Sequence, residues 1–184
     1  MTYVAMDAWK SVQGFMHPTE IAELQRLADM RRVLEIGSWK GRSAVGMLAT
    51  AASVVSIDHF RGDSYTGKAN TFPECYRNRT LNKAWDVWQI LIGDVKTVLP
   101  LVRCDGFDFV HVDADHTYEA TEYVLTALGA CGLRDSAAVA VHDYDTKQPQ
   151  YKGLVRATDD FIETSGRVLR VVHRLAVLEP AAGW

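Results

Sequence analysis

Acidic residues and a histidine are concentrated in the stretch "VHVDADHTYE" at residues 110–119, where they follow an apolar run. Carboxylates and imidazoles can hold a divalent metal ion, and they can also take a proton from a hydroxyl group near neutral pH. A second stretch, "AVAVHDYD" at residues 138–145, is also an apolar run that ends in His and Asp. The two stretches are therefore candidates for one reaction centre, provided that the fold brings their ends together.

Short apolar runs alternate with helix-like segments along the chain, a pattern typical of a parallel α/β sheet. The first helix is expected to begin near residue 18, with Thr19 as its N-cap. A tight turn near His173 is expected to join the last two strands into an antiparallel hairpin. The predicted strands cover residues 32–38, 53–59, 88–94, 107–113 and 137–143 and two segments within 167–180, and the predicted helices cover 19–30, 41–52, about 74–86 and 117–128.

Acidic residues recur at or near the carboxyl ends of the first five predicted strands. They are Glu35, Asp58, Asp94, Asp113 and Asp143. A single acid at such a position is common, because carboxylates cap helices and turns well. In an open α/β sheet, however, ligands bind in the crevice outside the strand ends, so five acids in succession predict a binding crevice there.

The segment "EIGSWKG" (35–41) places two glycines, Gly37 and Gly41, between a predicted strand and a predicted helix. Glycines permit a tight turn and let a ligand approach the backbone, although this spacing is not the phosphate-binding G-x-G-x-x-G pattern. Asp58 ends the next strand, about 20 residues further on, where an acid can accept hydrogen bonds from ribose hydroxyls. Together these features predict a cofactor that carries a nucleoside.

The successive segments "VLEIGSWKGRSA", "VVSIDH", "LIGD", "FDFVHVDADHTYEA" and "AVAVHDY" resemble, in order and spacing, the motifs of class I S-adenosylmethionine-dependent methyltransferases. The D-x-D-H-x-Y-E and H-D-Y pair is similar to that of small-molecule O-methyltransferases, including the metal-dependent catechol and antibiotic-sugar enzymes. The resemblance runs from about residue 30 to the terminal hairpin. It implies a Rossmann-like, doubly wound, seven-stranded sheet that is mostly parallel with a C-terminal antiparallel hairpin. The chain length suits a single domain over residues 1–184, in which residues 1–30 are expected to form an N-terminal helical cap.

The resemblance further implies S-adenosyl-L-methionine as the cofactor and a divalent metal, Mg²⁺ or Mn²⁺, beside it. The cofactor-binding residues that it implies are Glu35, Gly37, Ser38 and Gly41 near the methionine part, Asp58 at the ribose, Asp94 and Val95 at the adenine, and Asp113. The implied metal ligands are Asp113, His142 and Asp143. His142 departs from the pattern, in which a second acid is more usual, and an imidazole ligand shifts the preference from Mg²⁺ toward Mn²⁺, Fe²⁺ or Zn²⁺.

A catalytic base is expected within "DADH". Asp113 and Asp115 project to the same side of an extended strand, so one can bind metal while the other faces the substrate. Asp115 is the preferred base, and His116 is the second candidate because its unperturbed pKa near 6.5 suits proton transfer at neutral pH. Three alternatives stay open. In the first, Asp115 or His116 instead caps the helix that follows, and in the second, one of them acts as the base of a metal-independent methyltransferase. In the third alternative, the chain is a non-catalytic binding module. His111 is expected to be a buried, hydrogen-bonded histidine.

Composition restricts the partners. A net charge of -3 and a pI near 6.1 argue against nucleic acid, and no apolar run approaches the length needed to span a membrane. Three widely spaced cysteines suggest neither a disulfide framework nor a zinc site, which favours a reducing, cytoplasmic location. We expect a small-molecule hydroxyl acceptor. Most of its recognition should come from residues 1–17, 60–74 and 145–153, and a second copy of the chain in a homo-oligomer could add to it.

Overall fold

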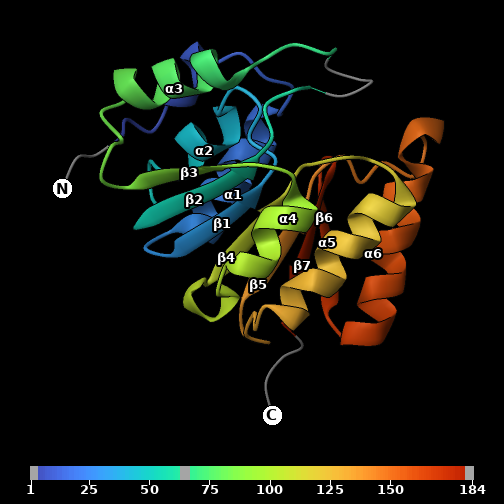
Figure 1. The fold of residues 1–184 in the computed structure, drawn as a ribbon. Coiled ribbons are helices and arrows are strands. Elements are labelled where there is room, and N and C mark those ends of the chain that lie inside the picture. Colours follow the sequence, from blue (N-terminus) through green and yellow to red (C-terminus); the bar gives the residue numbers. More distant parts are fainter. Residues whose placement is uncertain (1–3, 63–66, 181–184) are drawn as a thin grey trace.

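The computed structural model describes residues 4–62 and 67–180 and contains one seven-stranded sheet (Figure 1). The strand order is β3-β2-β1-β4-β5-β7-β6, in which β1 to β5 run parallel and β7 runs antiparallel to both β5 and β6. The strands are Arg32–Ile36 (β1), Ser53–Asp58 (β2), Trp88–Ile92 (β3), Phe109–Val112 (β4), Ala138–Val141 (β5), Val168–Val172 (β6) and Leu175–Glu179 (β7). The predicted fold class is therefore confirmed.

Helices cover both faces of the sheet (Figure 1). On one side lie α1 (Pro18–Ala28), α2 (Arg42–Met47) and α3 (Phe72–Leu81), and on the other lie α4 (Val95–Val98), α5 (Tyr118–Ala130) and α6 (Lys152–Ser165). Short 3-10 helices occupy Ala8–Ser11, Leu99–Leu101, Cys104–Gly106 and Pro149–Tyr151. Within the described ranges, no helix is long and apolar enough to cross a membrane.

The alternation of side chains along each strand builds two apolar cores, one on each face of the sheet. In β1, Val33 packs into the core beneath α1 and α2, while its neighbour Leu34 packs into the core beneath α5 and α6. In β4, Phe109 packs into the first of these cores and Val110 into the second. Because both faces of the sheet are covered, a ligand can reach these strands only at their ends. In open α/β sheets, the ligand binds at the carboxyl ends.

The first helix begins where the sequence predicts, but its cap differs from the prediction. His17 is the N-cap, its Nδ1 accepts a hydrogen bond from the Thr19 N–H, and Pro18 occupies the first turn. The prediction of Thr19 as the cap is wrong because proline favours the first helical position, which places the cap one residue before it. Glu20 completes a capping box by accepting a hydrogen bond from the His17 N–H at 2.6 Å.

Helix α6 is not among the predicted elements. Its inner face carries Leu154, Ala157 and Thr158, all buried, and the partly buried Phe161. This i, i+3, i+4, i+7 spacing is that of an amphipathic helix, so the signal was present in the sequence.

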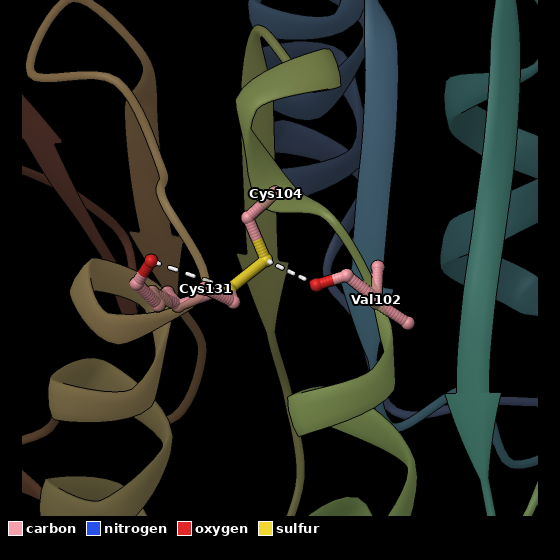
Figure 2. The surroundings of a disulfide bond; sticks show 4 residues. Val102, Cys104 and Cys131 are labelled. Atoms are coloured by element: carbon pink, nitrogen blue, oxygen red, sulfur yellow. Dashed lines mark hydrogen bonds between the residues drawn. A yellow bond between two sulfur atoms is a disulfide. The ribbon is translucent and has the colours of Figure 1, made fainter.

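Cys104 and Cys131 form a disulfide that the cysteine spacing did not predict (Figure 2). Cys104 begins a 3-10 helix before β4, and Cys131 follows the last turn of α5. Although 27 residues separate them in the sequence, the Cys104 N–H donates to the Cys131 carbonyl at 2.9 Å, so the fold brings the two residues together. Cys75 is free and buried. The cytoplasmic location stays a prediction.

Candidate active site

A cavity of about 740 Å³ lies at the carboxyl edge of the parallel strands. This volume is in the range of small-molecule sites. The strand order reverses between β1 and β4, so the cavity lies at the topological switch point where α/β proteins bind ligands. All the predicted site residues line the cavity except Glu35 and Gly41.

The three segments that were expected to recognise the acceptor all contribute to the cavity wall. Phe15 and Met16 come from the N-terminal segment, Gly62 and Thr71 from the loop after β2, and Tyr151 from the segment after β5. Residues 63–66 of that loop lie outside the described ranges. All three segments therefore border the cavity, and their recognition of an acceptor stays a prediction.

The part of the cavity at the ends of β1, β2 and β3, where the sequence predicts the cofactor, is here called the cofactor half. The residues that define it are Gly37, Ser38, Asp58, Asp94 and Val95. Gly37 has a φ of +87°, and a Cβ atom at this position would overlap the carbonyl oxygen of Asp113. Glycine is therefore required for the backbones of the β1 and β4 ends to approach one another.

Asp58 holds the turn after β1 through backbone N–H groups. Its Oδ2 accepts hydrogen bonds from the N–H groups of Ser38 and Trp39, both at 2.7 Å, and its Oδ1 accepts one from Phe60 N–H at 2.6 Å. A carboxylate satisfied by three backbone donors is fixed in orientation. Asp58 therefore connects the ends of β1 and β2 on the cavity floor.

Asp94 plays a similar local role at the end of β3. Its side chain accepts a hydrogen bond from Lys96 N–H at 2.8 Å and thereby caps α4, which begins at Val95. Both Asp94 and Val95 face the cavity.

Glu35 lies below the cavity, because strand alternation directs its side chain toward α2. Its carboxylate is fully buried and accepts hydrogen bonds from Ser43 Oγ at 2.5 Å and from Ser56 Oγ at 2.6 Å. His111, its register partner on β4, is also fully buried, with Nδ1 3.6 Å from Glu35 Oε1. Burial of His111 is as predicted, but neither of its ring nitrogens has a hydrogen-bond partner among the described residues, so that part of the prediction is wrong.

At the ends of β4 and β5, four side chains form what is here called the acid cluster. It consists of Asp113, His116, His142 and Asp143. Ligand atoms of Asp113, His116 and Asp143 lie within 4.8 Å of one another, close enough to hold one metal ion. Asp143 has a φ of +58°, a left-handed conformation that non-glycine residues adopt at a cost and that often marks functional sites.

His142 joins the two carboxylates of the acid cluster. Its Nδ1 lies 3.2 Å from Asp113 Oδ1 and 3.5 Å from Asp143 Oδ2, and its Nε2 lies 3.2 Å from Glu20 Oε2. Burial would lower the pKa of His142, but the three surrounding carboxylates, Asp113 foremost, raise it well above its ordinary value. The three carboxylates therefore favour the cationic form of this imidazole.

Neighbouring positive groups hold both carboxylates of the acid cluster in the ionised form. Burial would raise the pKa of Asp113, but His142 lowers it below its usual range. Burial acts likewise on Asp143, whose pKa is lowered by hydrogen bonds from His116 and His142 and by the nearby Arg174. Arg174 Nη1 lies 2.9 Å from Asp143 Oδ1.

Glu20 and Arg174 are the residues that sequence reasoning missed. Glu20 is fully buried, and burial would raise its pKa, but hydrogen bonds with His142, His173 and the His17 backbone lower it to about 2. Its only sequence signal is a position three residues after the helix cap, which is common in surface helices. Arg174 stands in a hairpin turn, where an exposed arginine is ordinary. Neither residue could be connected with the site without the fold.

Asp115 and His116 have separate environments although they are adjacent in the chain. Asp115 is exposed, lines the cavity, and accepts a hydrogen bond from Thr117 N–H at 3.0 Å. His116 Nε2 lies 3.0 Å from Asp143 Oδ2, inside the acid cluster. Thr117 is the N-cap of α5, so neither predicted alternative cap occupies that position.

The fold, a mostly parallel seven-stranded sheet with a C-terminal antiparallel hairpin, is that of class I methyltransferases. A family model described as a methyltransferase domain matches residues 34–144, which is more than half of the chain. The chain therefore belongs to this family of methyltransferase domains, and the predicted class is confirmed. A comparison with curated proteins gave no significant match.

Solved structures share the fold at low sequence identity. Cofactor-bound Rv0187 from MTB is 18% identical with a TM-score of 0.73, over 94% of this chain and 86% of that one. An O-methyltransferase from Bacillus cereus in complex with SAH is 16% identical with a TM-score of 0.66, over 90% and 82%. The O-methyltransferase TomG from Streptomyces achromogenes, involved in tomaymycin synthesis and in complex with SAM, is 21% identical with a TM-score of 0.65, over 97% and 87%.

Proposed function

We propose that this protein transfers a methyl group from S-adenosylmethionine to a hydroxyl group of a small molecule. The proposal depends on the observation that the cofactor half and the acid cluster lie side by side in the same cavity. One part supplies contacts for a nucleoside and an amino acid, and the other supplies ionised side chains for an acceptor. O-methyltransferases with bound SAH or SAM are among the solved structures that share the fold.

On the cofactor side, each predicted residue receives a role that its position allows. Asp58 would face the ribose, Gly37 and Ser38 would leave room for the methionine part, and Asp94 with Val95 would border the adenine; all five residues line the cavity. Glu35 and Gly41 do not line the cavity, and their proposed role is to shape the turn between β1 and α2.

The acid cluster fits a divalent metal ion. Two ionised carboxylates and an imidazole, from Asp113, Asp143 and His116, bring their donor atoms within 4.8 Å of one another. This donor set suits Mn²⁺ and tolerates Mg²⁺. A bound ion would lower the pKa of an acceptor hydroxyl and fix its orientation. His142, the ligand expected from the resemblance, lies beside this set and contacts both carboxylates.

Asp115 is the proposed base. Its exposed carboxylate faces the cavity beside the acid cluster, where it can accept the hydroxyl proton of the acceptor. As that proton leaves, an oxygen lone pair forms the new C–O bond, and the C–S bond of the sulfonium breaks with its electron pair on sulfur. The products are a methyl ether and S-adenosylhomocysteine. Because the sulfonium is already an activated donor, the protein has only to deprotonate and align the acceptor.

One observation favours a metal-independent variant of the same reaction. Arg174 and His142 already place positive groups next to Asp143 and Asp113, at 2.9 and 3.2 Å. These cations can balance the two carboxylates without a metal, in which case Asp115 or His116 acts as the base alone.

Under both variants we propose a small-molecule acceptor rather than nucleic acid or membrane lipid, in keeping with the net charge of -3.

Two measurements test the proposal. Calorimetry with S-adenosylhomocysteine should show binding, and an absence of binding at millimolar ligand would contradict the cofactor assignment. A panel of polyphenols, sugars and antibiotic-like hydroxyl compounds should then be screened for methyl transfer after chelation and again with Mg²⁺ or Mn²⁺. Activity only with added metal supports the metal-assisted form, and full activity after exhaustive chelation supports the alternative.

A further inference from the structure

Glu20 is a buried carboxylate that lies next to the acid cluster but does not line the cavity. Its Oε2 accepts from His17 N–H at 2.6 Å and lies 3.2 Å from His142 Nε2. Its Oε1 accepts from Arg174 N–H at 3.0 Å and lies 2.9 Å from His173 Nδ1. Four nitrogen groups from α1, the end of β5 and the β6–β7 turn thus converge on one carboxylate.

The first connection from Glu20 to the acid cluster passes through His142. The imidazole lies between two carboxylates, with Nε2 toward Glu20 and Nδ1 toward Asp113. A carboxylate that accepts the N–H of one ring nitrogen fixes the ring plane and thereby the direction of the other nitrogen. Glu20 therefore determines how His142 meets Asp113.

The second connection passes through the hairpin turn. Glu20 binds the backbone N–H of Arg174, while the side chain of the same residue reaches Asp143 Oδ1 at 2.9 Å. The stacked rings of His17 and His173, with centroids 4.4 Å apart, lie beside this connection. The position of the turn, and with it the guanidinium that contacts Asp143, depends on Glu20.

We propose that Glu20 is a positioning residue for the metal site. It orients Asp113 through His142 and Asp143 through Arg174, so that the two carboxylates face a common point. This inference rests on the metal-assisted form of the proposed function.

Helix capping alone does not account for this arrangement. A capping-box glutamate needs to accept only the backbone N–H of the N-cap residue. Glu20 has no exposed surface and serves three further nitrogen groups, and a buried charge is tolerated only with such partners. Glu23, one turn later on α1, instead pairs with Arg26 and Arg170, away from the cavity.

The test compares Glu20→Gln with Glu23→Gln, which is the same chemical change on the same helix. Mn²⁺ affinity is measured by electron paramagnetic resonance, and S-adenosylhomocysteine affinity by calorimetry. A glutamine must direct its NH₂ group toward two of the four nitrogen groups, so one connection is lost. We expect Glu20→Gln to bind Mn²⁺ about 10-fold to 100-fold more weakly, as for other residues that orient metal ligands. Glu23→Gln should match the wild type, and cofactor affinity should change little in either variant.

Each outcome decides a separate point. Equal Mn²⁺ affinity of folded Glu20→Gln and wild type overturns the role of Glu20 and leaves the proposed function intact. Equal weakening in both glutamine variants also overturns it, because the loss would then reflect the stability of α1. A wild type that binds S-adenosylhomocysteine but no Mn²⁺ overturns the metal-assisted form and this inference together, and leaves the metal-independent reaction.

A measurement on the wild type covers the case in which Glu20→Gln does not fold. The protein is labelled with ¹⁵N-histidine, and the Nε2 resonance of His142 is assigned by its loss in His142→Gln. We expect the chemical shift of a protonated Nε2 both without metal and with saturating Mg²⁺. A proton-free Nε2 in the Mg²⁺-loaded protein would mean that the hydrogen bond to Glu20 is absent, and it would overturn the inference.

Discussion

The cofactor half of the cavity is held mainly by backbone groups, whereas the acid cluster is held by side chains from distant parts of the chain. Asp58 binds the N–H groups of Ser38 and Trp39, about 20 residues earlier, and of Phe60, two residues later. In contrast, His142 meets Glu20 across 122 residues of sequence. The same edge of one sheet therefore carries one region built from local motifs and one built from long-range ionic contacts.

This difference determines how each region responds to change. Backbone N–H groups belong to the turn itself, so the cofactor half keeps its shape whenever the turn forms. The acid cluster keeps its geometry only while Glu20, His142 and Arg174 all remain in place, since removal of one partner leaves a buried charge unpaired. We therefore expect separate effects from mutations in the two regions, on cofactor affinity in one case and on methyl transfer and metal affinity in the other.

The largest effect is expected for Asp143→Ala. The change removes a carboxylate of the proposed metal site and leaves Arg174 and His142 without a partner on that side. We expect kcat/KM to fall roughly 100-fold to 10,000-fold, which corresponds to the several kcal/mol that a bound metal contributes. S-adenosylhomocysteine affinity should stay within about 3-fold, a difference of less than 1 kcal/mol.

Steady-state kinetics and calorimetry check this prediction, with Asp145→Ala as the matched control. Asp145 stands two residues later, accepts a hydrogen bond from Lys147 N–H and does not line the cavity. A parallel loss of cofactor affinity in Asp143→Ala would show that the two regions are not independent.

The contrast between the regions also explains what the sequence could reveal. Gly37 and Asp58 were recognisable because the spacing of a glycine turn and the next strand end is a local pattern. Asp113 and Asp143 were recognisable because parallel strands end at one edge. Glu20 and Arg174 were not, since their roles depend on α1 and the hairpin turn meeting at β5. Likewise, the Cys104–Cys131 pairing depends on the last turn of α5 meeting the segment before β4, which the cysteine spacing does not reveal.

A smaller effect, confined to the cofactor half, is expected for Asp58→Ala. Three backbone N–H groups lose their acceptor, and the ribose loses its proposed partner. Hydrogen bonds to a charged group contribute about 1.5 to 3 kcal/mol, so S-adenosylhomocysteine affinity should fall roughly 10-fold to 100-fold. Mn²⁺ affinity, measured by electron paramagnetic resonance, should not change. If Mn²⁺ affinity falls as much as cofactor affinity, the proposed separation of the two regions is wrong.

Acid should destabilise the protein through Glu20. Its folded-state pKa is about 2, below the ordinary value of 4.5, so its contribution is fully present above pH 4.5 and is lost as the pH falls toward 2. This difference corresponds to about 3 kcal/mol of unfolding free energy. Urea unfolding at pH 6, 4 and 2.5 should show a smaller acid-induced loss in Glu20→Gln than in the wild type. Equal losses in the two proteins would mean that the ionised Glu20 adds no stability.

The smallest effect on the site is expected from the disulfide, which lies outside both regions. Replacing Cys104 and Cys131 together with serine frees a segment closed across 27 residues. The loop-entropy relation gives a loss of about 3.5 kcal/mol in unfolding free energy. Neither cysteine lines the cavity, so methyl transfer at 25 °C and Mn²⁺ affinity should match the wild type while urea unfolding shifts to lower concentration. The double serine variant therefore separates stability from chemistry, because it is destabilised while its site is unchanged. If it also bound Mn²⁺ more weakly, lower stability alone would weaken metal binding. The weaker binding expected of Glu20→Gln could then not be assigned to the orientation of Asp113 and Asp143.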